Sequence, residues 1–240
     1  MKKLIIIPAF NEAANIGKLL KELRTKMKDF DVVVINDGSM DETSAVCRKE
    51  RTKVLDLPCN LGIGGAVQTG YQHGVSMGYD VIIQMDGDGQ HDPEYLKALV
   101  APVLTGEADI VIGSRFMEKQ GYQSSFWRRG GIRFYTVLIR MLTGISVSDP
   151  TSGFRAVSRE VAAYFAVSYP TDYPEPESIV SLNRLQYRIK EVPVRMRDRS
   201  GGKSSIRGVK TVYYMVKVTL AILIDLLKRE HAEKRYVQGG

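Results

Sequence analysis

The sequence VIIQMDGDGQHDPE, at residues 81–94, joins an apolar, β-branched run to two carboxylates that a single glycine separates. The apolar part is typical of a strand buried on both faces of a parallel sheet. In an open α/β sheet, ligands bind in the crevice just beyond the carboxyl ends of the strands. Asp86 and Asp88 would lie in that crevice, and Mg²⁺ or Mn²⁺ prefers such oxygen ligands, often together with substrate phosphates. The stretch therefore predicts a site for a metal ion and a diphosphate.

An ordinary polar turn is the alternative interpretation, because Asp-Gly is a common turn dipeptide. The other strand ends favour a site. Polar side chains follow three further expected strands: Asn11 and Glu12 follow 4–7, Asp37 and Ser39 follow 31–35, and Arg115 follows 109–112. Because the carboxyl ends of parallel strands meet at one edge of a sheet, these groups indicate one site rather than four unrelated turns.

Strands and helices alternate along the first half of the chain. Pro8 should end the first strand, and Asn11 could cap the helix that follows. Short connections between the elements predict an α/β fold with a mostly parallel sheet and helices on both faces. We expect strands at 4–7, 31–35, 54–57, 81–85 and 109–112, and helices at 12–28, 43–50 and 93–104. Segment 60–66 should run into a further helix through Val67, Gly70 and Val75.

The pattern changes after about residue 118. A loop at 121–125 should precede a helix from 126 to about 142, and another helix is expected near 159–166. The acidic, proline-bearing segment 173–177 follows, and the alternation in 185–197 predicts one or two late strands. At 240 residues the chain is long enough for one large domain, or one with a short appendage.

Two glycine-rich segments are candidates for binding anions. The first, 60–66, leads into a helix, where Gly65 would let backbone N–H groups approach an anion, although tight packing of the helix on a strand explains the glycines almost as well. The second, 198–204, carries Arg199 and Lys203. It is either a loop that orders over a phosphate or a flexible linker, and we favour the phosphate loop.

A strongly apolar helix is expected at about 206–229, interrupted by Lys210, Lys217 and Asp225. It has no clean apolar run of the ~20 residues that a membrane-spanning helix needs. Its tyrosines and the flanking Lys228 and Arg229 fit a helix that lies in a membrane interface. Packing on the domain or on a second subunit fits equally, so a homo-oligomer is possible.

Charge is distributed unevenly along the chain. Residues 1–118 carry 13 Lys+Arg against 17 Asp+Glu, residues 119–240 carry 21 against 10, and the net charge is +7. The basic half suggests an anionic partner, such as a phospholipid surface or a phosphorylated substrate. The acidic half argues against a nucleic-acid-binding protein. Cys47 and Cys59 show neither metal-ligand nor disulfide spacing, so we expect a reducing cytoplasm.

Six motifs resemble, in order, those of the inverting family 2 glycosyltransferases of the GT-A fold. They are PAFNE (8–12), NDGSMDET (36–43), NLGIGGAVQTG (60–70), DGDGQHDPE (86–94), GSRF (113–116) and DPTSGFR (149–155). The sequence looks most like the dolichyl- or polyprenyl-phosphate hexosyltransferases of that family, from about residue 4 to 207. The resemblance implies a GT-A (Rossmann-like) domain with a nucleotide-sugar-binding half (1–118), an acceptor-binding half (119–205) and a C-terminal amphipathic helix (206–240).

The resemblance also implies roles for particular residues. The donor nucleotide sugar would contact Pro8, Ala9, Asn11, Glu12, Asp37 and Gly65. The metal ion, Mg²⁺ or Mn²⁺, would be held on the donor diphosphate by Asp86, Asp88 and Gln90, and the diphosphate would be covered by Arg199 and Lys203. The acceptor phosphate would be bound by Arg115 with Arg128 or Arg129. Asp88 and Arg115 would be the catalytic residues.

These roles predict a metal-dependent transfer of a hexose from a UDP- or GDP-sugar to polyprenyl (undecaprenyl) phosphate, at the cytoplasmic face of the membrane, for cell-surface glycan assembly. A phosphate acceptor is ionised at neutral pH and needs no general base, whereas a sugar hydroxyl needs one. Glu175 and Glu177 are candidates for such a base. A glutamate near this position in the polyprenyl-phosphate enzymes has a structural role, which Glu177 matches better. Transfer to a hydroxyl of a cell-wall polysaccharide is therefore the alternative.

Two positions depart from the family pattern. Asn36 stands where many relatives have aspartate, which should alter the nucleotide contacts without abolishing them. Ile132 stands where a serine that helps to bind the acceptor phosphate is expected. A nucleotidyltransferase would share the acidic metal site, but it would normally show a glycine-rich loop with lysine or arginine after the first strand, where this chain has PAFNE.

Overall fold

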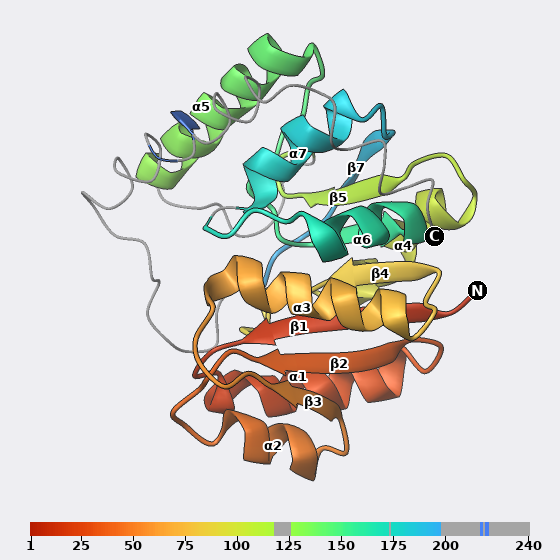
Figure 1. Ribbon diagram of the computed structural model, residues 1–240, viewed down its shortest axis with the longest axis vertical. Helices are drawn as coiled ribbons and strands as arrows, with labels where there is room; N and C mark the ends of the chain where they lie inside the picture. Colours follow the sequence, from red (N-terminus) through yellow and green to blue (C-terminus); the bar gives the residue numbers. More distant parts are fainter. Residues whose placement is uncertain (118–125, 173, 198–216, 218, 221–240) are drawn as a thin grey trace.

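The computed structural model describes residues 1–117, 126–172, 174–197, 217 and 219–220, without the side chains of residues 126–129. Seven described strands form one sheet in the order β3-β2-β1-β4-β6-β5-β7 (Figure 1). β6 runs antiparallel to its neighbours β4 and β5, and the remaining neighbours are parallel. The strands are β1 (Lys3–Ala9), β2 (Asp31–Asn36), β3 (Lys53–Asp56), β4 (Val81–Gln84), β5 (Ile110–Ser114), β6 (Arg155–Ser158) and β7 (Ile189–Pro193).

Helices cover both faces of this sheet, as the sequence predicts. Successive strand residues point to opposite faces, so that in β1 Leu4 and Ile6 join one core layer while Ile5 and Ile7 join the other. The first layer packs against α3 (Gly62–Ser76), α5 (Phe126–Thr143), α6 (Arg159–Val167) and α7 (Pro174–Arg184). The second packs against α1 (Ala13–Lys26), α2 (Thr43–Lys49) and α4 (Leu96–Leu104), which the 3-10 turn η1 (Pro93–Tyr95) precedes.

The first strand and its loop differ from expectation. Pro8 lies inside β1 and pairs with Ile35 of β2. A proline is tolerated there because the pairing of β1 with β4 has already ended at Ile6, so no ladder bond on that side needs its missing N–H. Asn11 does not cap α1. It adopts a left-handed conformation, with φ of 55°, and its Oδ1 accepts the backbone N–H of Met40 at 2.9 Å.

Two elements of the second half were not predicted. The tetrapeptide at 155–158 forms the antiparallel strand β6 in the middle of the sheet. The acidic segment at 173–177 supplies the first turn of α7, which begins at Pro174 and has Glu175 and Glu177 near its N-terminus. Proline is tolerated in the first helical turn, and acidic side chains are favoured there by the helix dipole.

The glycines of α3 allow this helix to pack closely. A Cβ atom on Gly74 would lie 2.3 Å from Cδ1 of Ile82 in β4. One on Gly64 would lie 2.3 Å from the carbonyl oxygens of both Pro170 and Thr171. Within segment 60–66, the Gly64 contact supports a packing role, although against the loop after α6 rather than a strand, and an anion contact at Gly65 stays a prediction.

The expected C-terminal helix, the loop at 121–125 and the glycine-rich segment 198–204 lie outside the described residues, apart from three helical positions at 217, 219 and 220. Among the helices that are described, none is both long and apolar enough to cross a membrane. The assignment of the last helix to a membrane interface or to a subunit contact stays open.

Candidate functional site

The candidate site lies at the carboxyl edge of the sheet. The parallel strands all end at this edge, and the antiparallel direction of β6 brings the loop before it to the same place. A pocket there collects side chains from four segments of the chain. It is lined by Asp86, Gln90, His91, Arg115, Thr151, Ser152, Gly153 and Met196.

His91 lies against Asp86, the first acidic residue of the pocket. Its Nδ1 accepts the backbone N–H of Asp86 at 3.0 Å, so a neutral imidazole carries its proton on Nε2, which lies 3.6 Å from Oδ2 of Asp86. The ring is buried and stacks on Phe154, with 4.7 Å between the centroids. His91 therefore fixes the backbone of Asp86 by a hydrogen bond and keeps Nε2 facing the Asp86 carboxylate, a role that was not predicted from the sequence.

The turn after β4 also orders the other two predicted metal ligands. Asp88 is buried, and its Oδ1 accepts the backbone N–H of Gln90 at 3.0 Å. Gly89, with φ of 76°, allows this tight turn. Asp86 and Gln90 line the pocket, whereas the buried Asp88 is not among its lining residues.

These residues fit a metal ion that a substrate completes. Within the described part of the chain, no three His, Cys, Asp or Glu side chains gather closely enough to enclose a cation. Mg²⁺ commonly takes one or two protein carboxylates, and substrate phosphates complete its shell. The carboxylate of Asp86 and the amide of Gln90 at the pocket, with Asp88 in the same turn, match that arrangement.

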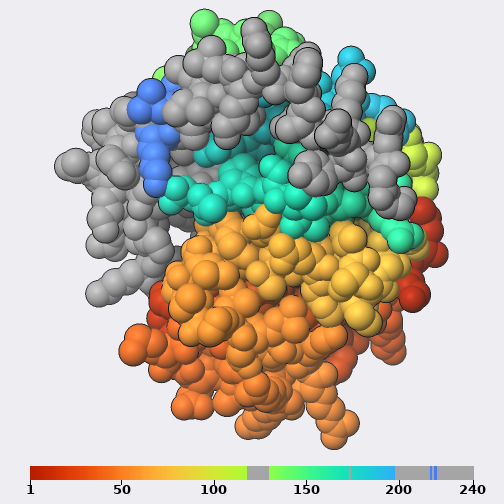
Figure 2. Space-filling view, in the orientation of Figure 1, coloured from red at the N-terminus to blue at the C-terminus, as the bar shows by residue number. Residues whose placement is uncertain are grey.

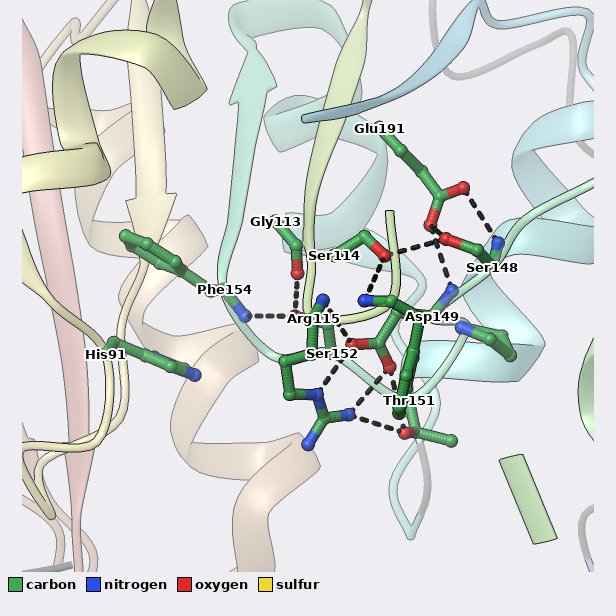
Figure 3. A network of polar contacts seen from close by, with 12 residues as sticks. His91, Gly113, Ser114, Arg115, Ser148, Asp149, Thr151, Ser152, Phe154 and Glu191 are labelled. Atoms are coloured by element: carbon green, nitrogen blue, oxygen red, sulfur yellow. Dashed lines mark hydrogen bonds and ion pairs between the residues drawn. The ribbon is translucent and has the colours of Figure 1, made fainter. Parts of the chain in front are cut away.

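Arg115, which follows β5, forms a buried ion pair with Asp149 (Figure 3). Nε donates to Oδ2 at 2.6 Å, Nη2 donates to Oδ1 at 2.6 Å, and Nη2 also donates to Thr151 Oγ1 at 3.1 Å. Burial lowers the pKa of the Arg115 guanidinium, but the paired carboxylate of Asp149 raises it by more, so the net shift is upward. Nη1 bonds to no described residue, and Arg115 lines the pocket. The arginine therefore offers one edge to a ligand.

The two candidate bases occupy different places. A Cβ atom on Gly153 would lie 3.2 Å from Oδ1 of Asp86 and 3.6 Å from Oε1 of Glu175, so these two carboxylates flank the same glycine of the pocket. Burial raises the pKa of Glu175; Arg155 opposes this rise, and the charge of Asp86 adds to it. Glu177 lies towards Tyr135 of α5. Burial of Tyr135 and the negative charge of Glu177 together raise the pKa of Tyr135 to about 12. Glu175 is therefore the glutamate beside the site.

The predicted nucleotide contacts lie on the same edge, over β1 and β2, but outside this pocket. Asp37 is buried, and its Oδ1 accepts the backbone N–H of Leu61 at 2.7 Å. Bonds between the two loops order Asn11 and Glu12, whose backbone N–H groups donate to Ser39 Oγ and Thr43 Oγ1, both at 2.9 Å. Pro8 and Ala9 belong to β1 itself.

The two departures from the family pattern have structural reasons. Asn36 donates from Nδ2 to Asp56 at 2.8 Å and accepts the backbone N–H of Ser39 at 3.3 Å. An aspartate at this position could not donate and would place a second carboxylate against Asp56. Ile132 is buried in α5, where an apolar side chain fits better than a serine.

Some predicted contacts lie outside what the structure describes. Arg128 and Arg129 are in the first turn of α5, but their side chains are not described, and neither are Arg199 and Lys203. Conversely, several residues of the DPTSGFR motif line the pocket or hold Arg115, and no role was predicted for them. The motif itself was the available signal.

Comparisons with known proteins point to one family. Residues 4–165 match the model described as glycosyl transferase family 2. The polyprenol monophosphomannose synthase of Mycolicibacterium smegmatis is 30% identical over 227 residues, which cover 90% of this chain and 85% of that protein. The undecaprenyl-phosphate mannosyltransferase of Micrococcus luteus is 32% identical over 230 residues, which cover 91% of this chain and 93% of that protein.

Solved structures show the same fold. The glucosyl-3-phosphoglycerate synthase of Mycobacterium tuberculosis, in complex with Mn²⁺, uridine diphosphate and glucosyl-3-phosphoglycerate, superposes with a TM-score of 0.71 at 21% identity. The match covers 93% of this chain and 79% of that one. The expected GT-A fold is thereby confirmed.

Proposed function

Because the chain belongs to glycosyl transferase family 2, and is therefore a glycosyltransferase, we propose that it moves a hexose from a nucleoside diphosphate sugar to a polyprenyl phosphate with inversion at the anomeric carbon. The observation that carries this proposal is the pocket in which Arg115 and the carboxylate of Asp86 lie together. Arginine binds phosphate through a planar set of donors, and Arg115 lines this pocket with Nη1 bonded to no described residue. The names of the two relatives supply the class of acceptor.

The chemistry matches these residues. In an inverting transfer, the acceptor oxygen attacks the anomeric carbon while negative charge builds on the departing diphosphate. A phosphate acceptor is already ionised at neutral pH, so Arg115 needs only to bind and orient it. Asp86, Asp88 and Gln90 would hold Mg²⁺ or Mn²⁺, which when bound supplies positive charge to the departing diphosphate.

We assign the donor to the part of the edge over β1 and β2. Asp37 and the loop that contains Asn11 and Glu12 are ordered there by the bonds between the two strand ends. Gly65, in the first turn of α3, remains a candidate contact. Arg199 and Lys203 would add charge at the diphosphate, and Arg128 or Arg129 would add charge at the acceptor.

The outer face of α5 supports peripheral contact with a membrane. Phe134, Val137 and Met141 are 39%, 52% and 79% exposed, and they recur at helical spacing beside the exposed Arg133 and Arg140. An exposed apolar stripe with flanking arginines suits the interface of an anionic membrane. α5 lies at one end of the molecule, where part of it is visible on the surface (Figures 1 and 2). A lipid-linked acceptor could thus be reached from a membrane surface.

Transfer to a sugar hydroxyl is the second candidate, because Glu175 lies beside the pocket and burial raises its pKa. A general base works best with a pKa near the working pH, and this shift moves Glu175 in that direction. Glu177 is the weaker candidate, since it lies towards α5.

The test is a donor-by-acceptor assay with the full-length protein, Mn²⁺ and a panel of UDP- and GDP-sugars, with or without undecaprenyl phosphate in detergent. We expect one donor to yield a hexosyl-phosphoryl-lipid by mass spectrometry. Asp88→Ala should abolish this product, and His73→Ala, in α3 away from the pocket, should not. Donor hydrolysis without a lipid product from any donor would contradict the proposal. Loss of turnover in Glu175→Gln, with donor binding intact, would then favour a hydroxyl acceptor.

A further inference from the structure

A carboxylate of β7 holds the loop that precedes β6 (Figure 3). The backbone N–H of Ser148 donates to Glu191 Oε2 at 2.7 Å, and the Ser148 hydroxyl donates to Oε1 at 2.9 Å. The backbone N–H of Asp149 also donates to Oε1, at 2.9 Å. No described Lys, Arg or His forms an ion pair with Glu191, so its described bonds all go to this loop.

The loop that Glu191 holds carries the partner of Arg115. Asp149 is fully buried, and besides the guanidinium it accepts the backbone N–H of Arg115 at 3.1 Å. β5 and β7 are parallel neighbours, and Ile112 of β5 pairs with Glu191. Arg115, directly after β5, and Glu191, in the neighbouring β7, therefore both contact the loop. Asp149 lies between them (Figure 3).

We propose that Glu191 is a positioning residue for Arg115, acting through Asp149, so that Arg115 presents Nη1 alone to the acceptor phosphate. This inference rests on the proposed function for the identity of the ligand. Nothing in the sequence motifs assigns a role to Glu191. It does not line the pocket, and it reaches Arg115 only through the loop.

The energetic reason is preorganisation. A long arginine side chain loses rotamer freedom when it binds a ligand, and ordering it in advance lowers that cost. Asp149 can order the guanidinium only if its own backbone is fixed. Glu191 fixes that backbone with the bonds to residues 148 and 149. Supporting contacts of this kind hold a functional side chain in its productive geometry.

The experiment compares Glu191→Ala and Glu191→Gln with a control, Glu107→Gln. The control removes an exposed carboxylate that pairs with Lys190, the neighbour of Glu191 in β7. Glu191→Ala should raise the KM for undecaprenyl phosphate about tenfold and leave kcat and the binding of Mn²⁺ with UDP or GDP within about twofold. Glu191→Gln should fall between, because it keeps one acceptor oxygen and turns the other into a donor. Glu107→Gln should match the parent protein.

A second measurement reads the position of Arg115 without catalysis. Its Nε–H should give a slowly exchanging ¹⁵N–¹H signal, assigned by its loss in Arg115→Lys, and Glu191→Ala should make that proton exchange faster with water. An unchanged signal and an unchanged acceptor KM would overturn the inference. So would an equal loss of donor and acceptor binding with the signal retained. If no donor yields a lipid product, the proposed function fails, and the signal alone still tests the positioning of Arg115.

Discussion

Arg115 is both charged and almost buried, with a side chain that is 10% exposed, because Asp149 supplies a countercharge that is wholly buried. Taking one partner away from such a pair leaves the other charge without compensation in a poorly solvated place. The position of Arg115 after a strand was predictable from the sequence. Its partner was not, because Asp149 lies 34 positions further along the sequence and only the tertiary fold brings the two together.

Asp149→Asn should therefore destabilise the protein by about 3 kcal/mol or more, measured by denaturant unfolding at pH 7. The matched control is Asp29→Asn, which removes the exposed partner of Lys3 and should cost at most about 1 kcal/mol. Equal losses in the two variants would show that the Arg115 pair is not the uncompensated buried charge described here.

His91 provides a second prediction at the residue scale. His91→Phe keeps an aromatic ring against Phe154 but removes both nitrogens that face Asp86. Its affinity for Mn²⁺ in the presence of UDP or GDP should fall about tenfold or more, as for other residues that orient metal ligands. Electron paramagnetic resonance of bound Mn²⁺ measures this without turnover. His73→Phe, in α3, should bind normally, and normal binding by His91→Phe would disprove the positioning role.

At the scale of elements, the glycines of α3 allow close contact between this helix and the chain around it. Gly64→Ala would press a methyl group against two backbone carbonyls, which cannot move as a side-chain tip can. We expect it to cost about 1–3 kcal/mol in unfolding free energy. Gly130→Ala is the control in α5. A Cβ atom added at Gly130 would meet no atom within 4 Å apart from the neighbouring backbone of its own helix. This variant should raise the unfolding free energy by about 0.5–1 kcal/mol. A stable Gly64→Ala variant would show that the contact with residues 170–171 relaxes.

The elements that the sequence predicts are those whose signal is local. β1, β2, β4 and β5 are apolar runs that end in polar groups, and their helices follow within a few residues. β6 has only four residues and begins with Arg155, so nothing in its composition marks a strand between β4 and β5. α7 begins with two prolines and two glutamates. This composition suggests a loop, although both proline and glutamate are favoured at the N-terminus of a helix.

The same distinction holds for the candidate site. Asp86 and Arg115 follow predicted strands, so their place on one edge was foreseeable. Thr151 and Gly153 reach the pocket only because β6 runs antiparallel, which is a property of the folded sheet. No local pattern in the sequence carries that information.

At the scale of the whole molecule, Arg197 joins three parts of the fold just after β7. It donates to both oxygens of Glu22 in α1, at 2.6 and 2.8 Å, and to Asp92 at 2.6 Å. Its backbone N–H donates to the carbonyl of Gln90 at 2.8 Å. The turn that contains Gln90 is thereby tied to α1, which is distant from it in the sequence.

This contact makes stability depend on pH. The side chain of Arg197 lowers the pKa of Glu22 from 4.5 to about 2, so the native state favours the ionised form. The stabilisation is fully present above pH 4.5 and is lost as the pH falls towards 2. The difference in unfolding free energy between the parent and Glu22→Gln should be on the order of 2 kcal/mol at pH 7 and should shrink below pH 4.5. A difference between the parent and Glu22→Gln that is constant with pH would refute the linkage.

The face of α5 gives a further prediction for the whole molecule. Val137→Glu should reduce sedimentation with vesicles that contain anionic phospholipid, because it places a carboxylate in the exposed apolar stripe. Val167→Glu is the control, since it makes the same change at an apolar residue of α6 that is 60% exposed. Equal binding by the two variants would exclude this face as the membrane contact.

The most direct test of the central claim compares two acceptors that differ only in their phosphate. The full-length protein, with Mn²⁺ and its preferred sugar nucleotide, is given either undecaprenyl phosphate or undecaprenol, and the lipid products are read by mass. The geometry at Arg115, together with the absence of any need for a general base, predicts a glycosylated product from the phosphate and none from the alcohol. Transfer to undecaprenol, or no lipid product from either acceptor, would contradict the account.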